Sequence, residues 1–258
     1  MSPEVVTSRS NARVKQLRAA FAGQARLSSG LIAIEGDHLV QEALRAGQPL
    51  KTVFLSERRD LPAFVPRGVE VVRLANDVFQ SCVETQTPQG IAALLVPSVG
   101  SVAAMLVDTP LILIAVALQD PGNLGTLIRS AEAFGATGVL TTPGTVSPWN
   151  QKTIRASAGS VFRVPLAQAT AEAMDLLAQS GVRLLAAVQH DAQPIETFDL
   201  RQPCAFLIGN EGAGLEPGWL NMADDRVTIP CPGPVESLNA AVAGSLLLYE
   251  ASRQRRIP

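Results

Sequence analysis

Long, uninterrupted apolar segments constrain the fold of this 258-residue sequence more than any other feature. Residues 111–118 read LILIAVAL, and residues 204–209 read CAFLIG. A strand with one face in water would alternate apolar and polar residues, and neither segment does so. Strands of this kind belong to parallel sheets that are covered on both faces. The pattern therefore predicts an α/β fold around a buried parallel sheet.

Composition excludes several classes of protein. The sequence is 47% hydrophobic and 17% charged, which is enough for a core and unlike a disordered chain. No apolar run reaches the roughly 18 residues that span a bilayer. No apolar segment follows the first charged residues, so we expect no secretory signal. Cys82, Cys204 and Cys231 lack CxxC spacing, which predicts reduced thiols, a cytoplasmic location and no metal site.

Helix and strand patterns alternate along two parts of the chain. A segment rich in Pro, Gly and Ser, residues 97–110, is the best candidate boundary. We predict a small α/β domain at residues 1–98, a linker at 99–110 and a larger domain at 111–258. In the small domain we expect helices near residues 11–22, 37–46 and 76–83, and strands near 31–36, 52–56, 69–74 and 91–96. In the larger domain we expect further strands near residues 138–142, 183–188 and 226–230, and helices near 123–134, 149–158, 171–181 and from 238 to the end.

Three loops in the larger domain hold candidate functional residues, because ligands of parallel sheets bind where the carboxyl ends of strands converge. The first loop lies in LQDPGNLGTLIRSAEAFGATGV, residues 118–139. Asn123 is expected to cap the following helix, and Arg129 lies on the flank of its apolar stripe. Two interpretations fit these positions. Either the side chains face a ligand, or Asn123 only caps the helix and Arg129 only extends its charged end to solvent along the apolar stripe.

The second loop, LIGNEGAGL, follows the strand at residues 204–209. Gly209 is expected to let the backbone approach a ligand closely, and Glu211 puts a charge at the end of an apolar strand. The loop lacks both the Lys-Ser/Thr pair of a P-loop and the GxGxxG spacing of a dinucleotide site. A simple turn is the alternative interpretation.

The third loop, within IPCPGPVESLNAAVAGSLLLYE, precedes the last predicted helix. Its prolines fix the backbone, and we expect Ser237 to cap the helix, with Asn239 in the first turn. Between residues 238 and 248 only Asn239 and Ser245 are clearly polar. A helix that is apolar on all faces must be enclosed by its own domain or by a partner subunit.

The charge of the chain is −2, but its cations are unevenly distributed. Five of them lie within the first 26 residues, against one acidic residue: Arg9, Arg13, Lys15, Arg18 and Arg26. Such a cluster either contacts phosphates or forms an ordinary solvated surface. His38 and His190 have no partner pattern, and we expect both to be structural or exposed.

The three loops, taken together and in this order, resemble the motifs of the SpoU (TrmH-like) branch of the SPOUT RNA methyltransferases. The matching segments are NLGTLIRSAEAFG, LIGNEGAGL and IPCPGPVESLNAAVAGSLLLYE. The segments RSNARVKQLR, IEGDHLVQEAL and ETQTPQGIAALL are similar to the substrate-binding domain that often precedes the catalytic one, a fold related to small RNA-binding ribosomal proteins. The resemblance implies a deep trefoil knot, S-adenosylmethionine as cofactor, a ribose 2′-hydroxyl as acceptor, and a homodimer through the C-terminal domain.

The resemblance also implies the roles of individual residues. The implied cofactor-binding residues are Leu207, Ile208, Gly209, Asn210, Gly212, Ile229, Pro230, Leu238 and Asn239. The implied catalytic residues are Arg129, Asn123, Glu211, Ser237 and Asn239. The implied RNA-binding residues are Arg9, Arg13, Lys15, Arg18 and Arg129. Because arginine stays protonated, we expect Arg129 to position the reacting oxygen and stabilise its charge rather than act as a base.

Several alternatives remain at the level of sequence. Asp120, Lys152 and Arg155 adjoin the motifs, and contact with RNA and ordinary surface roles are both open. The preceding domain favours ribosomal RNA as substrate, and transfer RNA is the alternative. A catalytically silent RNA-binding protein of the same fold is a rival interpretation, although every polar motif position is filled. A dinucleotide-dependent enzyme is disfavoured because GxGxxG is absent.

Overall fold

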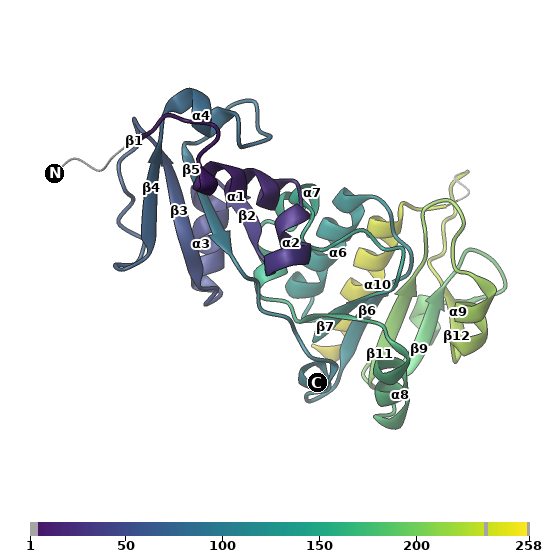
Figure 1. Cartoon of the computed structure of the whole chain (residues 1–258). Helices are drawn as coiled ribbons and strands as arrows, with labels where there is room; N and C mark the ends of the chain where they lie inside the picture. The colour runs from purple at the N-terminus through teal and green to yellow at the C-terminus, as the bar shows by residue number, and fades with distance from the viewer. Residues whose placement is uncertain (1–4, 235–236, 257–258) are drawn as a thin grey trace. The chain divides into compact units, whose positions relative to one another are not determined.

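The computed structural model describes residues 5–234 and 237–256 of the chain (Figure 1). The chain forms two compact units, Met1–Ser98 and Val99–Pro258. Each unit contains one β-sheet with helices packed on it, and each is described by itself.

The first unit holds a five-stranded sheet in the order β1-β4-β3-β5-β2. Parallel pairing joins β1, β4 and β3, whereas β5 pairs antiparallel with β3 and β2. The strands are β1 (Val5–Val6), β2 (Ile32–Glu35), β3 (Leu50–Ser56), β4 (Glu70–Leu74) and β5 (Ile91–Leu95). The helices are α1 (Ala12–Phe21), α2 (Gln24–Ser29), α3 (Asp37–Arg45) and α4 (Asn76–Gln80). Helices α1 and α3 lie on opposite faces of the sheet (Figure 1).

Apolar residues at helical spacing attach α1 to this sheet. Val14 and Leu17 are fully buried and pack in one cluster with Phe54 of β3 and Phe79 of α4. Asn11 caps the helix by accepting a hydrogen bond from the backbone N–H of Arg13, so the predicted helix near residues 11–22 is confirmed.

The second unit holds a seven-stranded sheet in the order β10-β12-β9-β11-β6-β7-β8, and all its pairs are parallel. The strands are β6 (Leu111–Ala115), β7 (Gly138–Thr141), β8 (Leu166–Gln168), β9 (Arg183–Ala187), β10 (Gln193–Pro194), β11 (Cys204–Ile208) and β12 (Asp225–Thr228). The helices are α5 (Val102–Met105), α6 (Pro121–Ala133), α7 (Gln151–Ala156), α8 (Ala171–Gln179), α9 (Pro217–Met222) and α10 (Ala240–Arg255), with 3-10 turns at Ser160–Phe162 and Ile195–Thr197.

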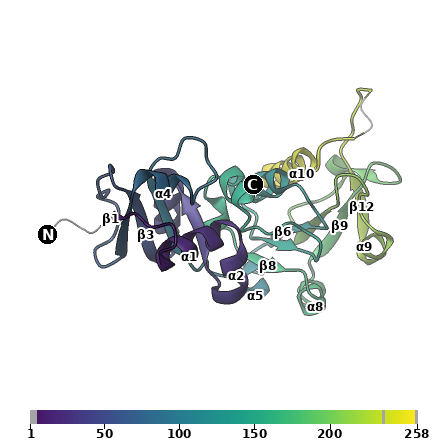
Figure 2. The same ribbon diagram turned by 45° about the horizontal axis from the view of Figure 1, so that its top comes forward.

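Helices cover both faces of this sheet, which confirms the parallel α/β fold predicted from the apolar strands. Helices α5 and α8 share a buried cluster with β6, β9 and β11, in which Met105 and Leu177 are fully buried. Helices α6 and α10 cover the other face (Figure 2). A Cβ on Gly244 of α10 would lie 2.4 Å from a methyl carbon of Leu127 in α6, so the two helices pack closely at this glycine and a larger residue would displace the Leu127 side chain.

The strand order creates a switch point between β6 and β11. The chain runs outward from β6 to β7 and β8, and then crosses to β9 on the far side of β11. Strand β11 lies between β6 and β9, since Leu207 pairs with Ile114 of β6 and with Ala186 of β9. The loops after β6 and β11 therefore diverge at one edge of the sheet, where a crevice is expected.

Two helix starts differ from the sequence prediction. Asp120, not Asn123, caps α6, because its side chain accepts from the Asn123 backbone N–H at 2.8 Å and Pro121 occupies the first helical position. Asn239, not Ser237, caps α10 by accepting from the backbone N–H groups of Ala241 and Val242 at 2.9 and 3.2 Å. The last helix was expected to run to the chain end, and residues 257–258 lie outside the described part.

The segment at residues 99–110, predicted as a linker, packs within the second unit. The backbone N–H of Gly100 donates to the carbonyl of Leu166 in β8 at 3.1 Å. Ser101 caps the short helix α5, and Met105 of that helix is fully buried. Strands β1, β8 and β10 and helices α2 and α9 were not predicted, because they are too short for a periodic pattern.

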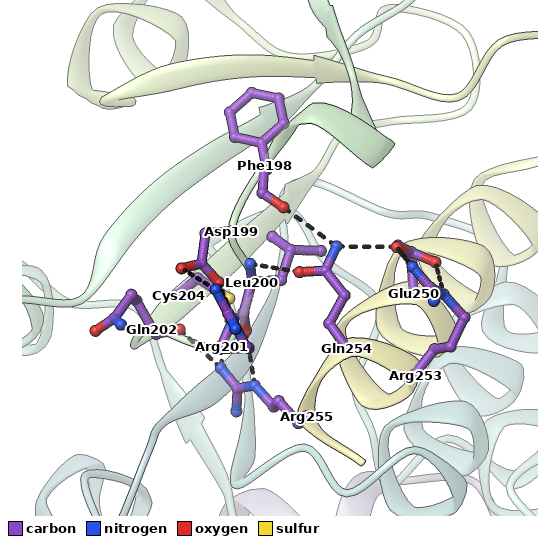
Figure 3. Close-up of polar contacts among 10 residues, drawn as sticks. All are labelled: Phe198, Asp199, Leu200, Arg201, Gln202, Cys204, Glu250, Arg253, Gln254 and Arg255. Carbon is purple, nitrogen blue, oxygen red and sulfur yellow. Dashed lines mark hydrogen bonds and ion pairs between the residues drawn. The ribbon is translucent and has the colours of Figure 1, made fainter. Parts of the chain in front are cut away.

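The last turn of α10 is fixed to the loop before β11 (Figure 3). The Arg255 guanidinium donates to the carbonyls of Leu200 and Gln202 at 2.8 and 2.9 Å, and to those of Thr109 and Pro110 at 2.7 and 3.0 Å. Gln254 accepts from the Leu200 N–H and donates to the Phe198 carbonyl (Figure 3). The helix that ends in these contacts begins at the candidate site.

Candidate active site

The loops after β6 and β11 are joined at the switch point by the side chain of Asn210. Its Nδ2 donates to the carbonyl of Ala117 at 2.9 Å. Its Oδ1 accepts from the backbone N–H groups of Gly212 and Ala213 at 2.9 and 3.0 Å. Backbone hydrogen bonds between Asn210 and Gly214 close the second loop into a tight turn. One amide side chain thus fixes the shape of this loop and its distance from the first.

Glu211 reaches across from this turn to the start of α6. Its Oε1 accepts from Asn123 Nδ2 at 2.9 Å and from the Asp120 backbone N–H at 3.3 Å. Its Oε2 accepts from the Gln119 N–H at 3.4 Å. Burial raises the pKa of Glu211, but the hydrogen bonds from Asn123 and from backbone N–H groups outweigh burial and leave the pKa lowered. The carboxylate is therefore ionised at neutral pH and acts as an acceptor, not as an acid.

Asn239 brings the third motif into the same network. Its Nδ2 donates to Asn123 Oδ1 at 3.0 Å, while its own oxygen caps α10. Glu211, Asn123 and Asn239 thus form a continuous polar chain across segments separated by 88 and 116 residues. The sequence predicted that these three side chains belong to one site, and the structure brings them together.

Asp120 and Lys152 flank the start of α6. The hydrogen bond from the Asn123 backbone N–H is the main cause that lowers the pKa of Asp120, and Lys152 adds to it with Nζ 3.3 Å from Oδ2. Both side chains are about half exposed, so the pair contributes little to stability.

Arg129 belongs to the first motif and Ser237 to the third, and both side chains are exposed. Arg129 lies on α6 two turns after its start and makes no hydrogen bond or ion pair with the described residues 5–234 and 237–256. The apolar stripe of α6 is complete without it, since Leu124, Leu127 and Ile128 are fully buried. Packing does not account for an arginine at this position.

A cavity of about 740 Å³ opens beside the polar chain. Of the implied cofactor-binding residues, eight line it: Ile208, Gly209, Asn210, Gly212, Ile229, Pro230, Leu238 and Asn239. Glu211 and Ser237 line it as well. Leu207 does not, because its side chain is fully buried in the cluster on the α5 and α8 face of the sheet.

Sequence reasoning missed the part of the cavity formed by the carboxyl ends of β9 and β12 and the residues just after them. These residues are Ala187, Val188, Gln189, His190, Val227, Thr228 and Cys231. His190, expected to be structural or exposed, is an exposed residue on the cavity wall. The signal was available, because both segments lie at the carboxyl ends of parallel strands, at one edge of the sheet.

Gly209 lines the cavity and also has a structural role within its own loop. A Cβ at this position would lie 2.4 Å from the carbonyl carbon of Gly214 and 2.7 Å from the backbone N of Leu215. Glycine is therefore required for the second loop to fold back on the strand end, before any ligand is considered. A larger residue such as valine at position 209 would therefore disturb the loop itself.

The implied RNA-binding cations of the first unit are mostly engaged. Arg9 pairs with Asp77 at 3.4 Å, Arg13 pairs with Glu70 at 2.6 Å, and Arg18 donates to the Ser81 carbonyl at 3.2 Å. Lys15 is exposed. His38, on α3, is also exposed.

The cavity fits S-adenosylmethionine in size and chemistry. Pockets for ligands of this size are typically about 300–1,000 Å³, mostly apolar, with a few polar groups. Ile208, Leu238 and Leu247 supply apolar wall, and the loop backbones supply hydrogen-bonding groups. The ionised Glu211 at the wall is the complement of a sulfonium cation. Within the described residues, no group of three or more His, Cys, Asp or Glu is placed to hold a metal ion.

The sheet, the switch point and the cavity define an α/β protein with a ligand site at the carboxyl edge of a parallel sheet. The model of the SpoU rRNA methylase family matches residues 110–249, and the model of the MRM3-like substrate binding domain matches residues 11–93. The chain therefore belongs to the SpoU rRNA methylase family, as the three sequence motifs predicted. It is an S-adenosylmethionine-dependent enzyme that methylates RNA at a ribose 2′-hydroxyl.

Individual relatives match nearly the whole chain. The Bacillus subtilis 23S rRNA (guanosine(2553)-2′-O)-methyltransferase RlmP is 33% identical over 246 residues, 95% of this chain and 97% of its own. A 23S rRNA (uridine(2479)-2′-O)-methyltransferase of Streptomyces viridochromogenes is 31% identical, covering 97% of this chain and 92% of its own. The crystal structure of AviRb from S. viridochromogenes with AdoMet is similar at a TM-score of 0.85 and 30% identity, covering 95% of this chain and 98% of that one.

Among the residues that the structure describes, every helix is too short or too polar to cross a bilayer.

Proposed function

We propose that this enzyme methylates a ribose 2′-hydroxyl in the 23S rRNA of the large ribosomal subunit, with the roles for its residues given below. The observation that carries the proposal is the polar chain of Glu211, Asn123 and Asn239 beside a cofactor-sized cavity. Two relatives that match nearly all of the chain are named for 23S rRNA, one for a guanosine and the other for a uridine. Their shared acceptor is the ribose, so we assign ribose recognition to the conformation of these loops and base recognition to other surfaces.

Arg129 is proposed to hold the acceptor. S-adenosylmethionine, when bound, supplies the methyl group on a sulfonium. The 2′-hydroxyl must lose its proton as its oxygen forms the new bond, so negative charge develops on that oxygen. A guanidinium stays protonated across the accessible pH range and can donate to an oxygen and a neighbouring phosphate together. An exposed Arg129 without a protein partner among the described residues is available for this role.

Glu211 and Asn123 are proposed to set the geometry around that oxygen. Glu211 is ionised and accepts from the Asn123 amide, which fixes the direction of the Asn123 oxygen towards Asn239. The lowered pKa of Glu211 makes it a weak proton acceptor, so we assign it orientation and electrostatic attraction to the sulfonium instead. Ser237, on the cavity wall, is proposed to contact the acceptor or the cofactor.

The outer face of α10 supports a homodimer. Val242, Leu246 and Tyr249 follow one another at helical spacing and are 48%, 42% and 44% exposed. Tyr249 packs edge-to-face on Phe134 of α6, with ring centroids 5.6 Å apart. An apolar stripe on the helix that carries Asn239 suits a second copy of this chain. We propose a homodimer through this face.

The remaining expectations extend the same proposal. The strand order, with β11 entering between β6 and β9 and α10 packed beside α6, supports a deep trefoil knot in the second unit. We propose that residues 1–98 bind the RNA substrate, with Lys15 exposed for phosphate contact, and that the protein works in the cytoplasm. Arg9, Arg13 and Arg18 would have to exchange their present partners to join it.

A substrate competition tests the proposed target. Purified protein is given tritiated S-adenosylmethionine with either unmodified 23S rRNA or unmodified transfer RNA. Incorporation into the rRNA alone, in a product that resists alkaline cleavage at one linkage, is expected. Incorporation into transfer RNA alone would contradict the assignment of the target.

A further inference from the structure

Ala117, in the loop after β6, has a backbone conformation that disfavours any residue with a Cβ. Its φ is +51°, in the left-handed region. Both of its backbone polar groups are held. Its N–H donates to Thr142 Oγ1 at 2.9 Å, and its carbonyl accepts from Asn210 Nδ2 at 2.9 Å. A strained backbone conformation persists where surrounding groups hold it in place. Here the Thr142 side chain holds the N–H of Ala117, and the Asn210 side chain holds its carbonyl.

The two side chains come from the ends of the strands that flank β6 on either side. Thr142 follows β7 and is 5% exposed, and Asn210 follows β11. Asn210 also accepts from Gly212 and Ala213, so both acceptor positions of its oxygen are used within the protein. Its amide is therefore oriented by the loop and not by a ligand.

The held residue leads directly into the Glu211 network. Two and three residues after Ala117, the backbone N–H groups of Gln119 and Asp120 donate to Glu211. A change in the Ala117 backbone would redirect both donors. Glu211 itself is the residue next to Asn210. Both sides of the Glu211 contact thus depend on the same pair of hydrogen bonds.

We propose that Thr142 and Asn210 form a latch that keeps Ala117 left-handed and so positions Glu211 against Asn123 during methyl transfer. The proposal rests on the proposed function. In it Asn210 is a positioning residue whose side chain acts through Glu211. The alternative is that the Asn210 side chain holds the cofactor directly.

Rescue by glycine separates these two roles. Without its clamp, Ala117 leaves the left-handed region, but a glycine there has no such preference. We expect Asn210→Ala to lower kcat roughly tenfold, which corresponds to about 1.4 kcal/mol. Adding Ala117→Gly to Asn210→Ala should raise kcat at least about threefold above that of Asn210→Ala alone, since glycine populates positive and negative φ about equally. Ala117→Gly alone should stay near the wild-type rate. The S-adenosylmethionine Kd, measured by calorimetry, should change less than kcat in each variant.

The second arm leaves Asn210 untouched and uses the other half of the latch. Thr142→Val removes the hydroxyl at nearly constant volume, and Thr142→Ser keeps it. Thr142 does not line the cavity, so a lower kcat for Thr142→Val with a normal rate for Thr142→Ser supports the latch. This arm remains informative where Asn210→Ala lacks a cooperative melting transition.

Three results would overturn the proposal. The first is a wild-type kcat for Asn210→Ala. The second is a loss of rate that Ala117→Gly does not restore while cofactor affinity falls in parallel. The third is a wild-type rate for Thr142→Val. Hydrogen exchange of the Gln119 and Asp120 amides, which donate to Glu211 and should speed up in Asn210→Ala, tests the latch without turnover. A wild-type protein that never methylates rRNA would refute the proposed function, and the exchange result would still decide on the latch.

Discussion

Replacing Glu211 by glutamine tests whether an ionised carboxylate organises the site. Glutamine keeps the shape of the side chain but has one acceptor oxygen, whereas Glu211 accepts from Asn123, Asp120 and Gln119 through two. In the variant the amide NH₂ must face at least one of these donors. The chain to Asn239 through Asn123 should loosen, since its first link loses a charged acceptor.

The magnitude follows from the three contacts. A hydrogen bond to a charged group contributes about 1.5–3 kcal/mol and a neutral one about 0.5–1.5 kcal/mol, so each retained bond loses about 1 kcal/mol. Glu211 is exposed, and its two backbone contacts are long, at 3.3 and 3.4 Å. We therefore discount the sum and expect about 1–2 kcal/mol, which is roughly a tenfold decrease in kcat.

Single-turnover transfer of labelled methyl to rRNA, with calorimetric titration of S-adenosylmethionine, measures this effect. Glu216→Gln is the matched control, because it removes the same charge from an exposed residue of the same loop region. A Glu211→Gln rate equal to that of the control would refute the assignment. Wild-type activity that appears only at a pH where Glu211 is protonated would refute the assignment as well.

The pH dependence provides a second readout of the same carboxylate. The pKa of Glu211 is lower in the folded protein than its ordinary value of about 4.3. Its contribution to the free energy of unfolding is therefore present above the ordinary value and is lost as the pH falls through the lowered one. The stability difference between wild type and Glu211→Gln should be constant near neutrality and shrink only in that acidic window.

Three further predictions concern other residues of the second unit. Arg129→Ala and Arg129→Lys should keep the fold and cofactor binding but lose about a hundredfold in methyl transfer, roughly 3 kcal/mol; near-normal turnover would remove Arg129 from the reaction. Gly209→Val should lower both the melting temperature and the cofactor affinity, because its side chain meets the Gly214 backbone; lost affinity with unchanged melting would favour a direct ligand contact. Leu246→Glu should shift the protein from dimer to monomer in light scattering, whereas the equally acidic change Val99→Glu, at an exposed residue away from α10, should not; a dimeric Leu246→Glu variant would refute the proposed face.

Buried strands and helices longer than about two turns were predictable from the spacing of their apolar residues. The unbroken apolar strands at β6 and β11 required a sheet covered on both faces. The spacing of Leu124, Leu127 and Ile128 likewise defined the buried face of α6. Gly135 follows α6 with a φ of +74°, the left-handed conformation that glycine commonly adopts after a helix.

Local competition between neighbouring polar residues was not predictable. Asp120 and Asn123 are both good caps, and only the position of Pro121 inside the helix decides for Asp120. Ser237 and Asn239 pose the same choice, which Asn239 wins by reaching two N–H groups of α10. The structural reason for glycine at position 209 was not predictable either. It depends on the Gly214 backbone, which the folded turn brings close to Gly209.

The contribution of β9 and β12 to the cavity was missed for a related reason. The loop after β9, which holds Gln189 and His190, carries no motif, and within β12 itself Thr228 lies just before the third motif loop rather than in it. These residues enter the cavity because β9 pairs in parallel with β11 and β12 pairs in parallel with β9, so all three strands end at the same edge of the sheet. Strand order, which the sequence does not state, decides which loops become neighbours.

Mapping of ribose methylation in cellular rRNA decides whether this enzyme modifies 23S rRNA through Arg129. RNA is compared between the host, a strain lacking the gene, and that strain supplied with either the wild-type gene or Arg129→Ala. We expect one 2′-O-methyl nucleotide of 23S rRNA that disappears on deletion, returns with the wild type and does not return with Arg129→Ala. An unchanged methylation map in the deletion strain, or full restoration by Arg129→Ala, would contradict this proposal.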